Sequence, residues 1–152
     1  MKRIFAMIAA LAILLAVAPA SLDAEESKYG KQKVVYHINY NGGDDDKRYR
    51  GAMRNIQNHI NAVGAENLDI KVVLHGNGVN LLKSAVGNQK LQSQVVDLKI
   101  QQVEFQVCNN TLVGREIDYD KELFEVFNDM IVPSGVAELS HLQQQGYTYI
   151  KP

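Results

Sequence analysis

Short apolar runs rich in β-branched residues alternate along this chain with stretches of helical spacing, and this alternation constrains the fold more than any other feature. Strands are predicted over residues 33–39, 68–74, 103–107, 130–132 and 147–150. Helices are predicted over residues 44–63, 79–86, 89–98, 119–127 and 134–145. Strands separated by helices pair in parallel, because parallel strands need crossover connections. The sequence therefore predicts an α/β fold: a three-layer, doubly wound, mainly parallel sheet of about five strands, flavodoxin-like in style.

The helical stretches also predict caps and buried faces. The acidic residues 44–46 begin the first helix, where negative charge suits the positive end of the helix dipole. A short helix follows the third strand, and Asn110 or Thr111 is its expected capping residue. The buried faces expected of the last two helices consist of Leu123, Phe124, Phe127, Val136, Leu139 and Leu142.

The N-terminal residues 1–20 have the three parts of a secretory signal peptide. A basic Met1-Lys2-Arg3 segment precedes an almost wholly apolar stretch, which ends at the small-residue pattern Ala18-Pro19-Ala20. The apolar stretch is shorter than the roughly 20 residues that a spanning helix needs. We therefore expect cleavage after Ala20, or after Ala24 as the second choice. A polar lead over residues 21–32 and one domain over residues 33–152 would remain, periplasmic or secreted and not bound to a membrane.

Charge and cysteine content limit the partners and the chemistry. The chain has 16 basic and 17 acidic residues and no arginine-rich run, so nucleic acid is not an expected partner. Cys108 is the one cysteine, so no intrachain disulfide can form. A single thiol in an oxidising compartment is either buried and inert or available for sulfur, metal or redox chemistry.

The loops that follow the predicted strands are short, polar and rich in glycine. Doubly wound sheets bind ligands beyond the carboxyl ends of their strands, where the strand order switches. No glycine-rich nucleotide motif and no nucleophile elbow occurs in these loops. The binding residues predicted there are Asn39, Asn41, Gly42, Gly76, Asn77, Asn109, Asn110, Thr111, Pro133, Ser134 and Gly135.

Cys108 is the predicted catalytic residue. It ends the third strand and directly precedes a helix, whose unpaired N–H groups favour a thiolate. A thiolate is both a nucleophile and a sulfur acceptor. The alternative is that Cys108 is a small buried hydrophobic residue, as many free cysteines are.

Two of the four histidines lie near the same predicted edge. His75 follows the second strand and is the second predicted catalytic residue, as a base or polar ligand. His37 lies inside the first strand, where a structural role is expected. With Cys108 the two could hold zinc or copper, but no short ligand spacing supports such a site, and no metal or other cofactor is predicted. His59 and His141 lie on predicted helices, as surface or packing residues.

Two segments carry a resemblance to a known family. The run Cys108-Asn109-Asn110-Thr111-Leu112 and the ending Gly146–Pro152, together with the β/α order, resemble the DsrE/DsrF-like sulfur-relay superfamily over roughly residues 33–152. The signal-peptide-bearing branch of that superfamily is the most similar. The resemblance implies a subunit that assembles into trimers or hexamers. It also implies a cysteine, here Cys108, that carries a persulfide between partner proteins. Arg115 stands where the relay members have an arginine, and Glu116 replaces their glycine.

The predicted function is therefore that of a periplasmic sulfur-handling protein, a sulfur carrier or transferase-like protein, and the sequence leaves catalytic turnover open. Cys108 would accept sulfane sulfur from a donor protein or pass it to an acceptor protein, and N–H groups of residues 109–111 would stabilise the charge. The alternative function is a non-enzymatic oligomeric module that binds a small ligand or a metal and has an unreactive cysteine. Tyr147 and Tyr149 alternate on the last strand, where they would cover an edge or join a subunit contact.

Overall fold

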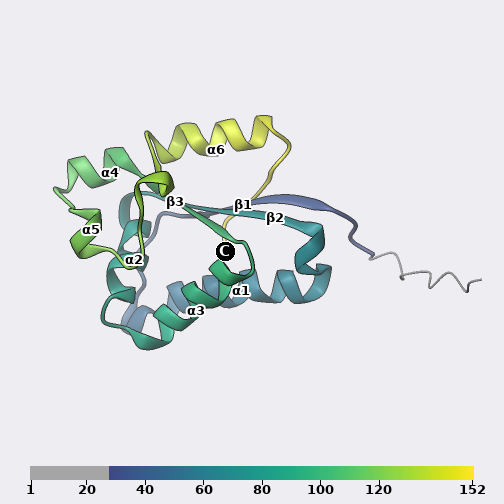
Figure 1. The fold of residues 1–152 in the computed structure, drawn as a ribbon, viewed down its shortest axis with the longest axis horizontal. Helices are drawn as coiled ribbons and strands as arrows, with labels where there is room; N and C mark the ends of the chain where they lie inside the picture. Colours follow the sequence, from purple (N-terminus) through teal and green to yellow (C-terminus); the bar gives the residue numbers. More distant parts are fainter. Residues whose placement is uncertain (1–27) are drawn as a thin grey trace, which may run out of the picture.

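A computed structural model describes residues 28–152 of the chain (Figure 1). The predicted signal peptide, its two cleavage sites and the first part of the polar lead lie outside these residues. No helix among residues 28–152 is long and apolar enough to cross a membrane.

One sheet of five parallel strands forms the centre of the molecule. The strands are β1 (Gln32–Ile38), β2 (Leu68–Leu74), β3 (Glu104–Cys108), β4 (Ile131–Val132) and β5 (Thr148–Ile150). Their order across the sheet is β4-β3-β2-β1-β5, and every neighbouring pair is parallel. The predicted fold class is confirmed, and each strand boundary lies within one residue of its predicted position.

Helices cover both faces of the sheet. On one face lie α1 (Lys47–Val63), α2 (Asn80–Ala85) and α3 (Gln89–Ile100), and on the other lies α6 (Gly135–Gln144) (Figure 1). The first three crossovers advance from β1 to β4, whereas α6 returns across the sheet to β5. Because crossovers are right-handed, reversing the direction moves the helix to the opposite face.

The two faces are buried unequally. The face under α1, α2 and α3 forms the large core, to which alternate strand residues such as Tyr36, Val72 and Phe105 contribute. The face under α6 has a much smaller apolar cluster, which consists of Val35, Val73, Leu139, Leu142 and Tyr147. Beyond that cluster, toward the carboxyl ends of the strands, the same face carries polar side chains.

The predicted helix over residues 119–127 is wrong beyond its first turn. Helix α4 (Asn109–Gly114) is followed by α5 (Tyr119–Glu122), and the chain then becomes extended at Leu123, with φ −115° and ψ 143°. Leu123 is buried as expected, whereas Phe127 is 60% exposed. The N–H of Phe124 donates to the carbonyl oxygen of Leu82 in α2, at 3.0 Å, so a tertiary hydrogen bond replaces a helical one.

The expected burial of Val136 is also wrong. Leu139 and Leu142 are buried under α6, but Val136 is 66% exposed. Gly135 and Leu139, four residues apart, define the buried face of the helix. Since each residue of an α-helix turns the chain by about 100°, Val136 lies on a flank that faces solvent.

Two helix starts differ from the prediction. Helix α4 begins at Asn109, directly after Cys108, so Asn110 and Thr111 lie in its first turn and neither caps it. Residues Asp44–Asp46 form a separate 3-10 turn, and α1 begins only at Lys47. Asp45 and Asp46 have φ angles of 49° and 53°, which break the helical path between the two segments.

Candidate functional site

Cys108 lies where the chain leaves neighbouring strands toward opposite faces of the sheet. After β3, the segment with α4 and α5 packs its Leu112 and Leu123 into the large core. After β4, α6 crosses the other face and contacts β1, β2, β3 and β5. Cys108 pairs with Val132 at this divergence, which is the position where doubly wound sheets bind ligands.

The Cys108 thiol is buried between the first turns of α4 and α6. Its residue is 5% exposed. Burial raises the pKa of the thiol, but hydrogen bonds from the backbone N–H of Gly135, from the hydroxyl and N–H of Thr111 and from the N–H of Asn110 lower it further than burial raises it. The net pKa is therefore below the ordinary cysteine value. The N–H groups at helix starts lack helical partners, so they stabilise an anion on the sulfur.

We expect Thr111→Val to raise the pKa of Cys108 and to slow its alkylation at neutral pH roughly twofold to tenfold, because the variant removes a hydroxyl donor from the thiolate. Below the raised pKa less thiolate is present, so alkylation slows; well above it the two proteins react alike. The rate of alkylation against pH, followed by intact mass, measures this shift. Thr148→Val is the matched control, since its hydroxyl donates to the carbonyl of Lys33 on β1. Equal pKa values in both variants would contradict the assignment.

His37 and His75 lie on the same face of the sheet as Cys108. In β1 and β2, Val35 and Val73 face α6, and the side chains two residues further on point the same way. The planes of the two imidazoles are inclined by 21°, their ring centroids are 4.7 Å apart, and their Nε2 atoms are 2.7 Å apart. At that distance one ring donates its N–H and the other accepts.

Tyr149 extends this pair toward the surface. Its hydroxyl lies 2.6 Å from Nδ1 of His37. Tyr149 is 42% exposed, whereas His37 is 7% exposed. The three side chains therefore form a hydrogen-bonded row, Tyr149–His37–His75, whose middle residue is buried and whose last residue, His75, is half-buried.

Both imidazoles of the row are neutral near pH 7. Burial lowers the pKa of His37 to about 4, and the charges of His75 and Lys151 add to this effect. Burial, followed by the charge of Lys151, lowers the pKa of His75 as well. Neutral imidazoles can both accept and donate a proton.

The geometry of the histidine pair is that of a hydrogen bond and does not fit two ligands of one ion. Two nitrogen ligands of tetrahedral zinc, each about 2.0 Å from the metal, stand roughly 3.3 Å apart. The Nε2 atoms of His37 and His75 are only 2.7 Å apart. Among residues 28–152, no group of three or more His, Cys, Asp or Glu side chains is placed to hold a metal.

The loops after β2, β3 and β4 meet around Cys108. The N–H of Gly76 donates to the Thr111 hydroxyl at 2.9 Å, and Nη2 of Arg115 donates to Oδ1 of Asn77 at 2.8 Å. The N–H of Asn110, the weakest of the donors to the Cys108 sulfur, is shared with the carbonyl oxygen of Pro133, to which it donates at 3.3 Å.

Two other predicted binding residues have local roles at this junction. Ser134 caps α6 by accepting the N–H of Ala137. Asn109 is exposed in the first turn of α4.

The loop after β1 is differently placed. Gly42 packs against the ring of Tyr49, so closely that a Cβ there would meet the ring at 2.7 Å. The Tyr49 hydroxyl lies 2.6 Å from the carbonyl oxygen of Asn77, which holds this loop beside the loop after β2. Among the described residues, no hydrogen bond joins the side chain of Asn39 or Asn41 to the surroundings of Cys108. The contact of Gly42 with Tyr49 fixes this loop at the carboxyl edge of the sheet.

Sequence reasoning did not select His37, Tyr149 or Lys151 for the site. The signal for His37 was its spacing of two residues from Val35, which repeats the spacing of His75 from Val73. Tyr149 could be placed only with the register of β5, in which it pairs with Val35 of β1.

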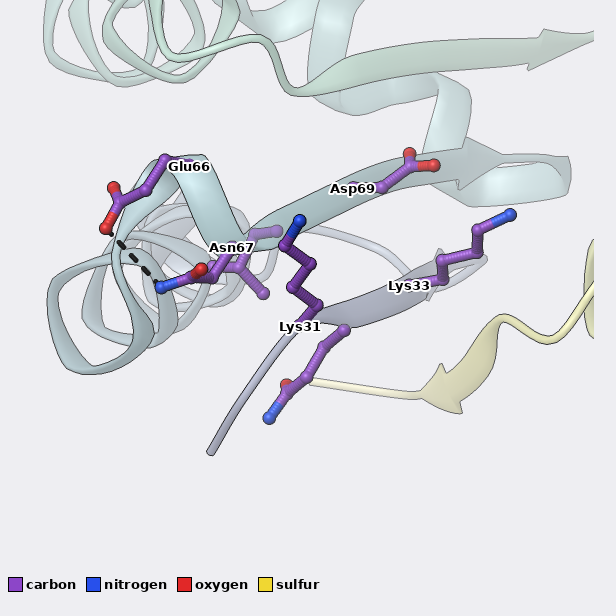
Figure 2. A pocket seen from close by; sticks show the side chains of 7 residues that line it. Lys31, Lys33, Glu66, Asn67 and Asp69 are labelled. Carbon is purple, nitrogen blue, oxygen red and sulfur yellow. Dashed lines mark hydrogen bonds between the residues drawn. The ribbon is translucent and has the colours of Figure 1, made fainter. Parts of the chain in front are cut away.

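A cavity of about 380 Å³ lies at the opposite edge of the sheet. Lys31, Lys33, Glu66, Asn67 and Asp69 are among its lining residues, at the amino ends of β1 and β2 (Figure 2). Strands rise about 3.3 Å per residue, so the seven residues of β1 or β2 separate it from the carboxyl edge by about 20 Å. This cavity is therefore separate from the site around Cys108. That site is identified by the hydrogen-bond donors around the sulfur and not by a cavity.

The comparisons with known proteins agree with this fold. The sequence model of the DsrE/DsrF-like family matches residues 33–152. A solved structure of a protein of unknown function, MTH1491 from Methanobacterium thermoautotrophicum, is 32% identical to this chain. The two superpose with a TM-score of 0.66, and the match covers 80% of this chain and 100% of that one. No curated protein matches the chain.

Proposed function

We propose that this chain, which belongs to the DsrE/DsrF-like family, is an exported sulfur carrier that accepts sulfane sulfur on Cys108. The family is associated with sulfur relay in general. The observation that supports a role for Cys108 is the set of N–H and O–H donors that lowers the pKa of its thiol despite burial. The same donors would stabilise the negative charge of a persulfide formed there.

The proposed step is a sulfur exchange that needs no external oxidant. The Cys108 thiolate attacks the outer sulfur of a persulfide donor, R–S–SH. A bond forms between Sγ and that sulfur, while the bond between the two donor sulfurs breaks and its electron pair leaves with R–S⁻. The products are Cys108–S–SH and a thiolate. The persulfide proton is then available to His75, on the same face of the sheet.

Export and assembly belong to the same proposal. The signal-peptide pattern of residues 1–20 supports export to the periplasm or beyond. Resemblance to the exported branch of the family supports assembly into trimers or hexamers, and a protein partner that gives or takes the sulfur. Light scattering of the mature protein at micromolar concentration tests the assembly, and a monomer there would contradict it.

Intact mass after exposure to a sulfane-sulfur donor tests the central claim. Mature protein is incubated with a small-molecule persulfide, desalted and weighed. We expect one added sulfur per chain, which a thiol reductant removes. Cys108→Ser is expected to gain none. Equal sulfur uptake by Cys108→Ser, or none by the wild type, would overturn the proposal.

One observation favours the alternative of a binding module with an unreactive cysteine. Cys108 is 5% exposed. That alternative predicts alkylation of Cys108 only after denaturation, and a copurifying ligand mass in native mass spectrometry. Alkylation of the native protein with an apparent pKa below the ordinary cysteine value would exclude it.

A further inference from the structure

We infer that Tyr149, His37 and His75 form a proton path that connects Cys108 to solvent, with His37 and Tyr149 as positioning residues for His75. The inference rests on the proposed function, because such a path serves a thiol that gives up and regains a proton. His37 and Tyr149 would thereby affect the chemistry without touching the sulfur donor.

The first argument is the continuity of the row. The hydroxyl of Tyr149 is 2.6 Å from Nδ1 of His37, and Nε2 of His37 is 2.7 Å from Nε2 of His75. Each ring of His37 and His75 thus uses Nε2 in the link between them. Tyr149 is 42% exposed and His37 is 7% exposed. His75 is half-buried, so the outer end of the row reaches water and its middle residue is the most enclosed.

The second argument is the position of His75 beside Cys108. Leu74 of β2 pairs with Val107 of β3, so His75 and Cys108 occupy the next position in the same register. Gly135 lies against both residues. A Cβ at Gly135 would come within 2.8 Å of Cβ of His75, and the Gly135 N–H hydrogen-bonds the Cys108 sulfur. Nε2 of His75 is engaged with His37. The structure shows no hydrogen bond between His75 and the Cys108 sulfur among residues 28–152, so the path requires Nδ1 to reach the thiol during the reaction.

Along this path one proton enters at His75 and one leaves at Tyr149, with no change of oxidation state. Nδ1 of His75 takes the proton of Cys108, and the N–H at Nε2 of His75 passes its proton to Nε2 of His37. The N–H at Nδ1 of His37 then passes a proton to the hydroxyl of Tyr149, which releases its own to water. Both imidazoles end as the opposite neutral tautomer, and the reverse sequence returns a proton to the site.

The surrounding charges favour coupled transfer between neutral rings. Lys151, directly after β5, lowers the pKa of both imidazoles by its positive charge, in addition to the effect of burial. A resting imidazolium on His37 or His75 is therefore costly at neutral pH. From α6, the residue packed on His75 is the uncharged Gly135. From β3, Cys108 is the titratable neighbour.

Tyr149→Phe tests the path, because it removes the terminal hydroxyl and keeps the ring. The persulfide exchange rate is measured in water and in deuterium oxide across pH. We expect the rate of Tyr149→Phe to fall roughly threefold to tenfold, as loss of one hydrogen bond predicts, together with a reduced solvent isotope effect. We expect His37→Gln to show a smaller solvent isotope effect than Tyr149→Phe. A purely structural role would change the rate without changing the isotope effect.

The control is a second histidine–tyrosine pair, which joins β1 to α1. Tyr36 of β1 faces the large core and its hydroxyl lies 2.8 Å from Nδ1 of His59. His59→Gln breaks this bond on the opposite face of the sheet. We expect the exchange rate and isotope effect of His59→Gln to match those of the wild type.

A measurement without any sulfur donor keeps the two proposals separate. Imidazole ¹⁵N chemical shifts report the tautomers of His37 and His75, and Tyr149→Phe should change both together. If the wild type takes up sulfur and Tyr149→Phe keeps the isotope effect, the path is wrong and the carrier function stands. If the wild type takes up no sulfur, the carrier function fails. In that case, an unchanged His75 tautomer in Tyr149→Phe would overturn the path as well.

Discussion

Gly78→Ala is expected to lower the free energy of unfolding by about 3 kcal/mol or more. A Cβ at Gly78 would lie 1.8 Å from the carbonyl oxygen of Ile38 and 2.5 Å from its carbonyl carbon. These are backbone atoms, so no side-chain rotation relieves the contact. The same oxygen accepts the N–H of His75 at 3.3 Å, which ties the end of β1 to the loop after β2. The added methyl group would therefore force the end of β1 and the loop after β2 apart.

Chemical denaturation of the variant measures this loss. Gly87→Ala is the matched control, because a Cβ at Gly87 meets no atom within 4 Å. We expect that control to be neutral or slightly stabilising, since alanine reduces the freedom of the unfolded chain. Equal free energies of unfolding for the two variants would contradict the close packing of Gly78 on β1.

Gly135→Ala is expected to slow alkylation of Cys108 at neutral pH by about tenfold or more, because it raises the pKa of the thiol. A Cβ there would lie 2.8 Å from Cβ of His75 and 3.2 Å from its ring atoms Cγ and Cδ2. Either His75 or the start of α6 must move. The Gly135 N–H is the strongest of the contacts that lower the thiol pKa, so displacing it favours the protonated thiol.

The pH profile distinguishes this cause from loss of folding. Well above the raised pKa, Gly135→Ala and the wild type should alkylate at the same rate; at lower pH the variant should be slower. Gly114→Ala, at the end of α4, is the control, because a Cβ there meets no atom within 4 Å. A wild-type profile for Gly135→Ala would show that α6 does not set the pKa of Cys108.

The sheet was predictable from sequence because its signals are local. Runs such as Val34-Val35-Tyr36 bound by polar and glycine-rich segments identify strands, and the intervening helices require parallel pairing. The end of α5 was not predictable, because its cause is a hydrogen bond from Phe124 to Leu82, in a distant part of the chain. No spacing within residues 119–127 encodes that partner.

Some residues of the candidate site were likewise predictable from local sequence, and others were not. Cys108 and His75 could be placed because each ends or follows a strand, and carboxyl ends of parallel strands share one edge. His37 lies inside β1, and its approach to His75 depends on the pairing of β1 with β2. Tyr149 is 112 residues from His37 in the chain, so only the three-dimensional structure joins them. The polar row is thus a property of strand register rather than of any sequence motif.

The unequal burial of the two sheet faces has a consequence for the kinetics of the thiol. Helix α6 is held by a small apolar cluster, so it is the kind of element that opens by local unfolding while the rest of the sheet stays folded. Gly135 begins that helix and covers Cys108. An observed modification rate is then the product of an opening equilibrium constant and an intrinsic rate. Low concentrations of denaturant, which favour opening, would accelerate modification even though each opening removes a donor from the thiolate.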